Sequence, residues 1–397
     1  MNLYRHRFLF YPLIFFIALF LLDKIFLLPE ARNNFIQPGG MLYYSQRESQ
    51  IRKLRAHLAR KKPGEKILVV FGDSRSFALG DYGFKMVGIH GVSVYNFAGP
   101  QALPAYHAYL AGRLFKGVNR PDYLLMGISP DGFNRQAGIL ASPVMNHGLS
   151  REFIDEYRSQ FPKADYKTYE SSRRYALAGM GFSMKTLIVR AKNTLFGSKK
   201  SGSIPLPAIL AFTRQYGVKM SPGDLAGIVK LLGGAAKNDL KRYSLKNSPQ
   251  AEMLGRGRGA QYAWFGRASA EKLKRDTDRL AGVYFRNFTV ASEQFFFLEE
   301  TLRRARAANI KTLVFRPRVN PYLLEKFKQL PLAHDIWRRV ERISRSHGAR
   351  ALDLNRAPET SCSVFYDASH LSITCFPPIT RFLARNLGIP VPPESGK

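Results

Sequence analysis

The chain has 397 residues, 45% of them hydrophobic, and its 61 lysines and arginines outnumber its 29 acidic residues to give a formal net charge of +32. Length and apolar content exclude a chain too small to bury a core and allow one large domain or two modest ones. The charge predicts a basic surface that contacts a membrane face, an acidic polymer or nucleic acid, without choosing among these partners.

The N-terminal segment is strongly apolar. Residues 8–22 carry no charge, and the apolar character resumes at 25–28 after Asp23 and Lys24. Counted to residue 28, the segment has about twenty-one residues, roughly the length needed to cross the hydrocarbon core of a bilayer. No small-residue cleavage signature follows, so we expect an uncleaved signal anchor rather than a removed signal peptide. Residues 1–30 are therefore predicted to form a cytoplasmic tip and a single transmembrane helix in the inner or plasma membrane.

Charge and cysteines indicate where the body of the protein lies. Arg5 and Arg7 precede the apolar segment and favour an extracytoplasmic, periplasmic body, although Lys24 and the basic residues between 47 and 55 dilute this bias. A disulfide between Cys362 and Cys375 would clamp the loop between them in an oxidising compartment. The alternative is two unpaired small core residues.

Residues 31–65 are predicted to form a juxtamembrane linker and helix. After a break at residues 37–40, the spacing over 44–62 predicts a helix with Ile51, Leu54 and Leu58 on one face and basic residues on the other. This helix could lie on anionic headgroups, or it could be an ordinary solvated surface helix.

From residue 66 the pattern alternates between strands and helices. Short apolar strands are predicted at residues 67–71, 92–97, 123–128, 312–315 and 350–354. Helices are predicted at 101–116, at 295–308 and over 323–346, the last with an interruption at Pro331. The alternation predicts an α/β fold with three layers, in which helices cover both faces of a parallel sheet. Residues 66–134 and 291–397 would form the two parts of this domain, with ligands beyond the carboxyl ends of the strands.

Residues 135–290 lose this alternation and are predicted to form a mostly helical basic insertion. Segments 212–219 and 225–232 have helical spacing, and glycine-rich breaks separate such segments. An Arg-Gly-Arg-Gly stretch at 256–259 could follow a nucleic-acid backbone. A single copy favours a basic lid or cap over the site instead.

Two distant motifs carry the candidate chemistry. Ser74 follows the first predicted strand in a Gly-Asp-Ser turn, and Asp367 stands three residues before His370. A histidine base and an orienting carboxylate are what a serine needs to react at neutral pH. Because 296 positions separate Ser74 from His370, folding must bring the two motifs together. The alternatives are an ordinary turn serine and a capping or core histidine.

These motifs resemble those of the SGNH, or GDSL-type, hydrolase superfamily. The resemblance covers residues 66–134 and 295–388 and implies that Ser74 is the nucleophile, His370 the base and Asp367 its orienting partner. It also implies a flavodoxin-like parallel sheet and an oxyanion-hole glycine at Gly99. The third sequence block of the family, normally Gly-x-Asn-Asp, corresponds here to residues 127–131. This block departs from the family pattern, because Ser129 stands where the asparagine is expected. Ser129 or Asn134 would then have to donate to the oxyanion, and losing one such donor costs on the order of 100- to 1000-fold in rate.

The N-terminal segment and the third block are similar to those of the extracytoplasmic branch of this superfamily. That branch includes proteins that D-alanylate teichoic acids and O-acetylate alginate, and its members commonly work beside a membrane-bound O-acyltransferase. Arg75 and Arg316 flank the predicted cleft and could hold a phosphate or carboxylate, or they could be ordinary surface arginines.

Three functions remain open at this stage. The first is a membrane-anchored serine esterase or O-acyltransferase that acts on an anionic or acylated envelope polymer or lipid and needs no cofactor or metal. The second is a catalytically inactive envelope binding or assembly protein with the same fold. The third, a nucleic-acid binder, is disfavoured by the expected extracytoplasmic location, and no Walker loop, dinucleotide fingerprint or metal-ligand spacing is present.

Overall fold

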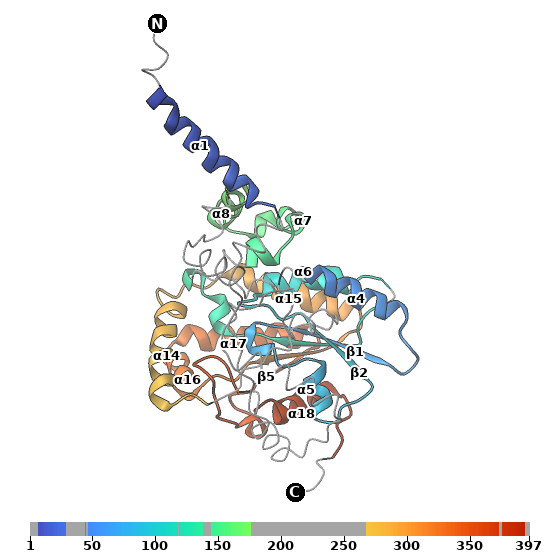
Figure 1. Ribbon diagram of the computed structural model, residues 1–397. Coiled ribbons are helices and arrows are strands. Elements are labelled where there is room, and N and C mark those ends of the chain that lie inside the picture. The colour runs from blue at the N-terminus through green and yellow to red at the C-terminus, as the bar shows by residue number, and fades with distance from the viewer. Residues whose placement is uncertain are drawn as a thin grey trace, which may run out of the picture.

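A five-stranded parallel sheet forms the centre of the protein (Figure 1). The computed structural model describes residues 7–28, 44, 47–117, 119–137, 144–175, 267–372 and 375–393. The strands are β1 (Lys66–Phe71), β2 (Val92–Asn96), β3 (Tyr123–Gly127), β4 (Lys311–Arg316) and β5 (Arg350–Asp353). They lie in the order β2-β1-β3-β4-β5, and every neighbouring pair is parallel. The α/β class, the parallel sheet and the position of each strand are thus confirmed.

Helices cover the sheet on both faces. One face is covered by α4 (Arg47–Ala59), α6 (Pro104–Leu114), α15 (Ser292–Ala307) and α17 (Pro331–Ser346). The other is covered by α5 (Asp81–Met86) and α18 (Phe376–Leu387), as Figure 1 shows. The remaining α-helices described are α1 (Arg7–Ile25), α7 (Arg151–Glu156), α8 (Lys163–Arg174), α14 (Ala270–Tyr284) and α16 (Pro321–Lys328). The predicted helix over 323–346 is two helices because Pro331 begins the second.

Strand β1 explains why the sheet is buried on both faces. Ile67, Val69 and Phe71 pack into the core under α4, α6, α15 and α17, whereas Leu68 and Val70 pack under α5 and α18. All five side chains are fully buried. Since burying one such side chain contributes about 1.5–3 kcal/mol, this apolar run fixes β1 in the middle of the sheet. The first functional motif begins directly after it.

Helix α4 is part of the α/β domain. Its predicted apolar face is found as expected, with Ile51, Leu54 and Leu58 buried in the core that also contains α6. Polar contacts join the two helices as well: the guanidinium of Arg113 donates to Glu48 at 3.0 Å, and Arg55 donates to the carbonyl of Arg113 at 2.9 Å. Arg52 and Arg55 lie on the exposed side of α4, whereas Arg47 at its start is buried.

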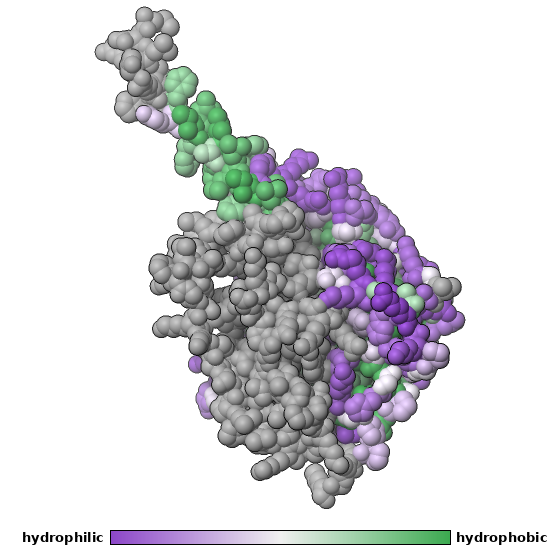
Figure 2. All heavy atoms as spheres, turned by 45° about the vertical axis from the view of Figure 1, so that its right-hand side comes forward, coloured by the Kyte–Doolittle hydropathy of each residue, from purple (hydrophilic) through white to green (hydrophobic). Residues whose placement is uncertain are grey.

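Helix α1 projects from the domain with apolar side chains on its surface. Figure 2 shows it as a hydrophobic rod beside a hydrophilic face of the domain, and its exposed residues include Phe15 and Phe16 at 63% and 64%. At its C-terminal end, Lys24 lies over the ring of Tyr175, which follows α8, with 4.8 Å from Nζ to the ring centroid. Within the residues that the structure describes, no helix reaches the combined length and hydropathy of a membrane span.

The two ends of the predicted insertion meet at one point. Asn134 and Val290 form an antiparallel bridge, and the Arg135 amide donates to the carbonyl of Thr289 at 2.8 Å. The described parts of the insertion contain the helices α7, α8 and α14. The predicted helical segments 212–219 and 225–232 and the glycine-rich stretch at 256–259 lie outside the described residues.

Cys362 and Cys375 form a disulfide, with 5.4 Å between their Cα atoms. Of the two alternatives that the sequence left open, the bonded one is therefore found. The bridge encloses the loop that carries Asp367 and His370, and a closed loop of this kind has fewer conformations to lose on folding.

Candidate active site

Ser74 lies at the carboxyl end of β1, on a turn that three neighbouring residues hold in place. At Gly72, where φ is 155°, an added Cβ would lie 2.2 Å from the hydroxyl of Ser76, so this position needs glycine. The carboxylate of Asp73 accepts from the amide of Arg75 at 2.9 Å and caps the 3₁₀ turn Ser74–Ser76. Asn96, at the end of β2, donates to the carbonyl of Ser76 at 2.8 Å. The nucleophile candidate thus sits on a turn bonded to two strands.

His370 and Asp367 come from the loop before α18. One carboxylate oxygen of Asp367 accepts from the amides of Ser369 at 2.8 Å and His370 at 2.9 Å. Its two oxygens also lie 2.9 and 2.8 Å from Nδ1 of His370. Asn320 donates to the carbonyl of Ala368 at 2.5 Å and ties this loop to the start of α16. The short Asp-x-x-His spacing therefore makes a local turn that aims the carboxylate at the imidazole.

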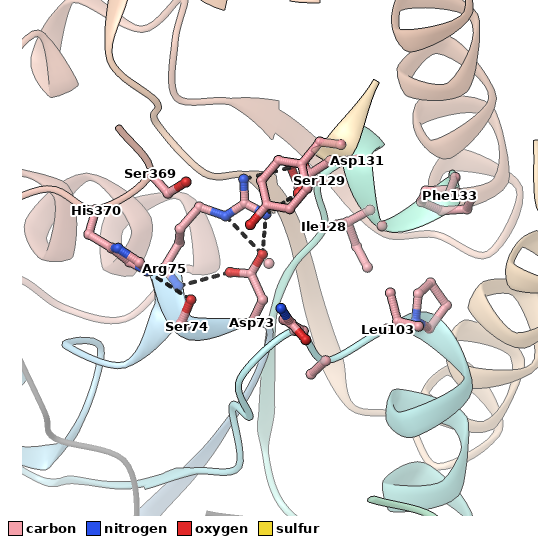
Figure 3. Close-up of a pocket in the computed structure, with 16 residues that line it drawn as sticks. Asp73, Ser74, Arg75, Leu103, Ile128, Ser129, Asp131, Phe133, Ser369 and His370 are labelled. Carbon is pink, nitrogen blue, oxygen red and sulfur yellow. Dashed lines mark hydrogen bonds and ion pairs between the residues drawn. The ribbon is translucent and has the colours of Figure 1, made fainter. Parts of the chain in front are cut away.

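The two motifs meet across 296 positions of sequence. Nε2 of His370 lies 2.9 Å from Oγ of Ser74 (Figure 3). Because Asp367 can only accept when ionised, Nδ1 carries the proton and Nε2 is free to accept from the serine hydroxyl. Burial raises the pKa of Asp367, but His370 and the backbone hydrogen bonds outweigh burial and bring the pKa below its ordinary value. We call Ser74, Asp367 and His370 the triad wall of the site.

A second set of polar groups, which we call the ion-pair wall, consists of Asp73, Arg75, Ser129 and Asp131. The guanidinium of Arg75 is buried and donates to Asp73 at 2.8 Å and to Asp131 at 2.9 Å. Burial raises the pKa of Asp131, but the charge and hydrogen bonds of Arg75 and the Ser129 hydroxyl outweigh it, so the pKa lies below its ordinary value. With two carboxylates around one guanidinium, this wall carries an excess of negative charge.

In the structure the three groups predicted as oxyanion donors are bonded to acceptors of the protein itself. The amide of Gly99 donates to the carbonyl of Gly72 at 3.0 Å, and the hydroxyl of Ser129 donates to Asp131. The side chain of Asn134 is fully buried, donating to the carbonyl of Tyr284 at 2.6 Å and accepting from the amide of Thr289 at 3.1 Å. Asn134 therefore holds the insertion in place, and the other two groups stabilise the loops around the site.

The two arginines predicted to hold an anion are also paired internally. Arg75 pairs with both Asp73 and Asp131, which its position beside the motif did not reveal. Arg316 donates to Asp353 at 3.1 Å, lies over the ring of Phe327, and is absent from the described lining of the pocket. Burial lowers its pKa and outweighs the effect of Asp353. Both arginines are thus paired with carboxylates of the protein in this structure.

The two walls enclose a narrow pocket. The space open to the centre of a water molecule is about 40 Å³, enough for a few waters. Its lining adds residues that the sequence reasoning missed, among them Gln101, Leu103, Tyr284 and Ser369. Ser369 lies between Asp367 and His370 in the sequence, and this position could have predicted that it lines the site. Tyr284 lies at the end of α14 in the insertion, where no strand end marked it. In the described part of the chain no cluster of three metal-ligating side chains occurs.

Fold and site define an α/β protein with a serine, a histidine and an aspartate hydrogen-bonded in series at the carboxyl edge of its parallel sheet. The chain belongs to the family described as protein of unknown function DUF1574, whose model matches residues 3–225 and 228–387. No curated protein matches the chain. The family description assigns no activity, so the function has to be inferred from the site.

Proposed function

We propose that this protein is a membrane-anchored serine esterase or O-acyltransferase with an SGNH-type fold, acting on acyl esters of an envelope glycan or lipid. The observation that carries the proposal is the hydrogen-bonded series from Ser74 through His370 to Asp367, with 2.9 Å between Oγ and Nε2 and 2.8 Å between Nδ1 and the carboxylate. Nucleophilic serine chemistry needs this order of groups at this spacing.

The chemistry follows from these contacts. Nε2 of His370 takes the proton of Ser74 as Oγ attacks the ester carbonyl, and Asp367 stabilises the resulting imidazolium. Collapse of the tetrahedral intermediate breaks the ester bond, His370 returns the proton to the leaving alkoxide, and the acyl group stays on Ser74. Attack by water gives hydrolysis, and attack by a sugar hydroxyl gives transfer. In each case His370 removes the proton of the attacking group.

The ion-pair wall supports an uncharged acyl group as the part of the substrate that enters the pocket. The guanidinium of Arg75 already binds two carboxylates. A phosphate or carboxylate in this narrow space would face the negative charge of Asp73 and Asp131 without a free cation. An anionic polymer would therefore bind outside the pocket, on the basic surface of the protein.

The membrane anchor is proposed from helix α1 and the disulfide. A rod of exposed apolar side chains such as Phe15, Phe16 and Phe20 is costly in water and favourable in lipid. A bilayer around this helix would leave the α/β domain at its surface. The bond between Cys362 and Cys375 supports an oxidising, extracytoplasmic compartment, where a membrane-bound O-acyltransferase could supply the acyl group.

A fluorophosphonate probe, which labels activated serines, tests the proposal. We expect labelling of the wild-type protein, none of Ser74→Ala, and labelling of Ser76→Ala, a matched control on the same turn whose hydroxyl is buried. In cells, the variant Ser74→Ala should change the ester content of the envelope. Equal labelling of wild type and Ser74→Ala would end the enzyme proposal.

The second candidate function is an inactive binding or assembly protein. It is favoured by the observation that Gly99, Ser129 and Asn134 are all committed to protein partners. Without a donor for the oxyanion, the triad would lack a large part of its rate enhancement. The labelling experiment separates the two functions, since the inactive protein would remain unlabelled while still binding its polymer.

A further inference from the structure

The loop that carries the triad histidine also carries a buried hydroxyl with no assigned task. Ser369 is 5% exposed and lines the same pocket as Ser74 and His370. Its Oγ makes no hydrogen bond within the described part of the chain. Buried polar groups are nearly always paired, so an unpaired one beside a reactive serine calls for a ligand.

Ser369 is held firmly in this position. Its amide donates to Asp367 at 2.8 Å, and Asn320 holds the carbonyl of the preceding residue, Ala368, at 2.5 Å. Figure 3 shows its hydroxyl between His370 and Arg75, pointing toward the guanidinium side of the pocket. Since Oγ lies just beneath the pocket surface, rotation about the Cα–Cβ bond decides whether it faces a bound molecule. A rigid backbone with a rotatable donor suits a group that pairs only when substrate is present.

Several other hydrogen-bond donors at the site are already paired. The Arg75 guanidinium and the Ser129 hydroxyl donate to carboxylates, and the Gly99 amide donates to a backbone carbonyl. The hydroxyl of Ser74 is directed at His370. By contrast, Ser369 borders a second, apolar pocket behind Arg75, lined by Phe315, Leu371 and Phe376 among others. A molecule bound beside Ser369 thus meets an unpaired hydroxyl and an apolar surface.

We propose that the hydroxyl of Ser369 binds the carbonyl oxygen of an uncharged acyl ester in this pocket, in place of the asparagine donor that the third block lacks. This inference rests on the proposed function. It assigns the donor that the ion-pair wall cannot supply, and it makes Ser369 a substrate-binding residue whose contribution grows as negative charge develops on that oxygen.

The first experiment compares hydrolysis of p-nitrophenyl acetate by the full-length wild type, Ser369→Ala and Ser372→Ala. Ser372 is the matched control, because its hydroxyl is also buried and unpaired in the described chain but does not line the pocket. We expect kcat/KM to fall about 100- to 1000-fold for Ser369→Ala, as for loss of one oxyanion donor, and to stay within about twofold for Ser372→Ala, with equal melting temperatures. Equal kcat/KM for the two variants would overturn the proposal.

The second experiment measures binding without turnover. The affinity of p-nitrophenyl acetate is compared between Ser74→Ala and Ser74→Ala/Ser369→Ala by ligand-observed NMR. Loss of one neutral hydrogen bond should weaken binding about five- to tenfold, and equal affinity would overturn the proposal. If the wild type neither hydrolyses the ester nor reacts with the fluorophosphonate, the proposed function fails. The binding comparison then still decides whether Ser369 holds the acyl group.

Discussion

The triad wall and the ion-pair wall border the same pocket but differ in how their polar groups are paired. On the triad wall each group passes its hydrogen bond onward, from Ser74 to His370 to Asp367, and the first member ends in the pocket. On the ion-pair wall, Arg75 is enclosed between Asp73 and Asp131. In the first arrangement Nε2 of His370 is placed to accept the proton of Ser74 while Asp367 stays ionised, whereas the second is closed on itself. Under the proposed function, the chemistry would belong to the triad wall and structural support to the ion-pair wall.

The strongest test of this division is Asp367→Asn. The amide would keep the size of the side chain but lose the charge that fixes the Nδ1 proton of His370, and we expect about a 10⁴-fold fall in kcat. Esterase kinetics with p-nitrophenyl acetate measure the effect. Asp131→Asn is the matched control on the ion-pair wall. A larger loss of kcat in the control, at unchanged folding stability, would reverse the assignment of the two walls.

Replacing Arg75 tests the structural role of the ion-pair wall. Arg75→Met leaves the buried Asp131 and the partly buried Asp73 without a cation, and we expect the free energy of unfolding to fall by about 3–5 kcal/mol. Urea denaturation followed by circular dichroism measures it. Adding Asp131→Asn to this variant should recover part of the loss, because the buried charge that remains is smaller. Unchanged stability of Arg75→Met would show that the wall does not support the fold.

Removing the disulfide loosens the loop on which the triad wall depends. For Cys362→Ser/Cys375→Ser we expect a loss of about 3 kcal/mol of unfolding free energy, the value for closing a loop of about 15 residues. Esterase activity should fall at temperatures where the global fold persists, since His370 lies within the loop. Thermal melting and activity are measured on the same samples. Full activity up to the melting temperature would show that the loop is held without the bond.

A smaller effect is expected from a buried histidine in the core behind the two walls, which makes folding stability depend on pH. His107 is buried against Phe71, and burial lowers its pKa to about 3. The unfolded chain protonates a histidine near pH 6.5 and so binds more protons than the folded state as the pH falls. Wild type should therefore lose about 2 kcal/mol between pH 7 and pH 5 relative to His107→Leu. Urea denaturation at both pH values checks this, and exposed His334→Leu should behave as wild type.

The sheet and the triad wall could be predicted because their signals are local. Continuous apolar runs such as 67–71 indicate buried strands, and the spacing of Asp367 and His370 by itself brings the carboxylate to the imidazole. Because parallel strands end at the same edge of the sheet, Ser74 is then expected to lie near Asp367 and His370. Whether Cys362 and Cys375 form a disulfide could not be decided from the sequence, because both the bonded and the free form suit two small buried side chains.

The ion-pair wall could not be predicted because its contacts are made across the fold. Arg75 meets Asp131 from 56 positions away, on a different strand end. Asn134 finds its partners at residues 284–289, at the far end of the insertion. A single sequence shows that these side chains can donate hydrogen bonds but not which acceptors reach them first. The internal bonds of Gly99, Ser129 and Asn134 could not be predicted for this reason.

The bridge between Asn134 and Val290 has a consequence for how this chain can vary. Because residues 135–289 leave and re-enter the α/β domain at neighbouring points, their number does not affect the register of β3 with β4. Relatives could carry a longer, shorter or different insertion while keeping the same arrangement of Ser74, Asp367 and His370. A foreign segment could be grafted at the same junction by protein engineering, with the hydrogen-bonded pair Asn134 and Thr289 retained.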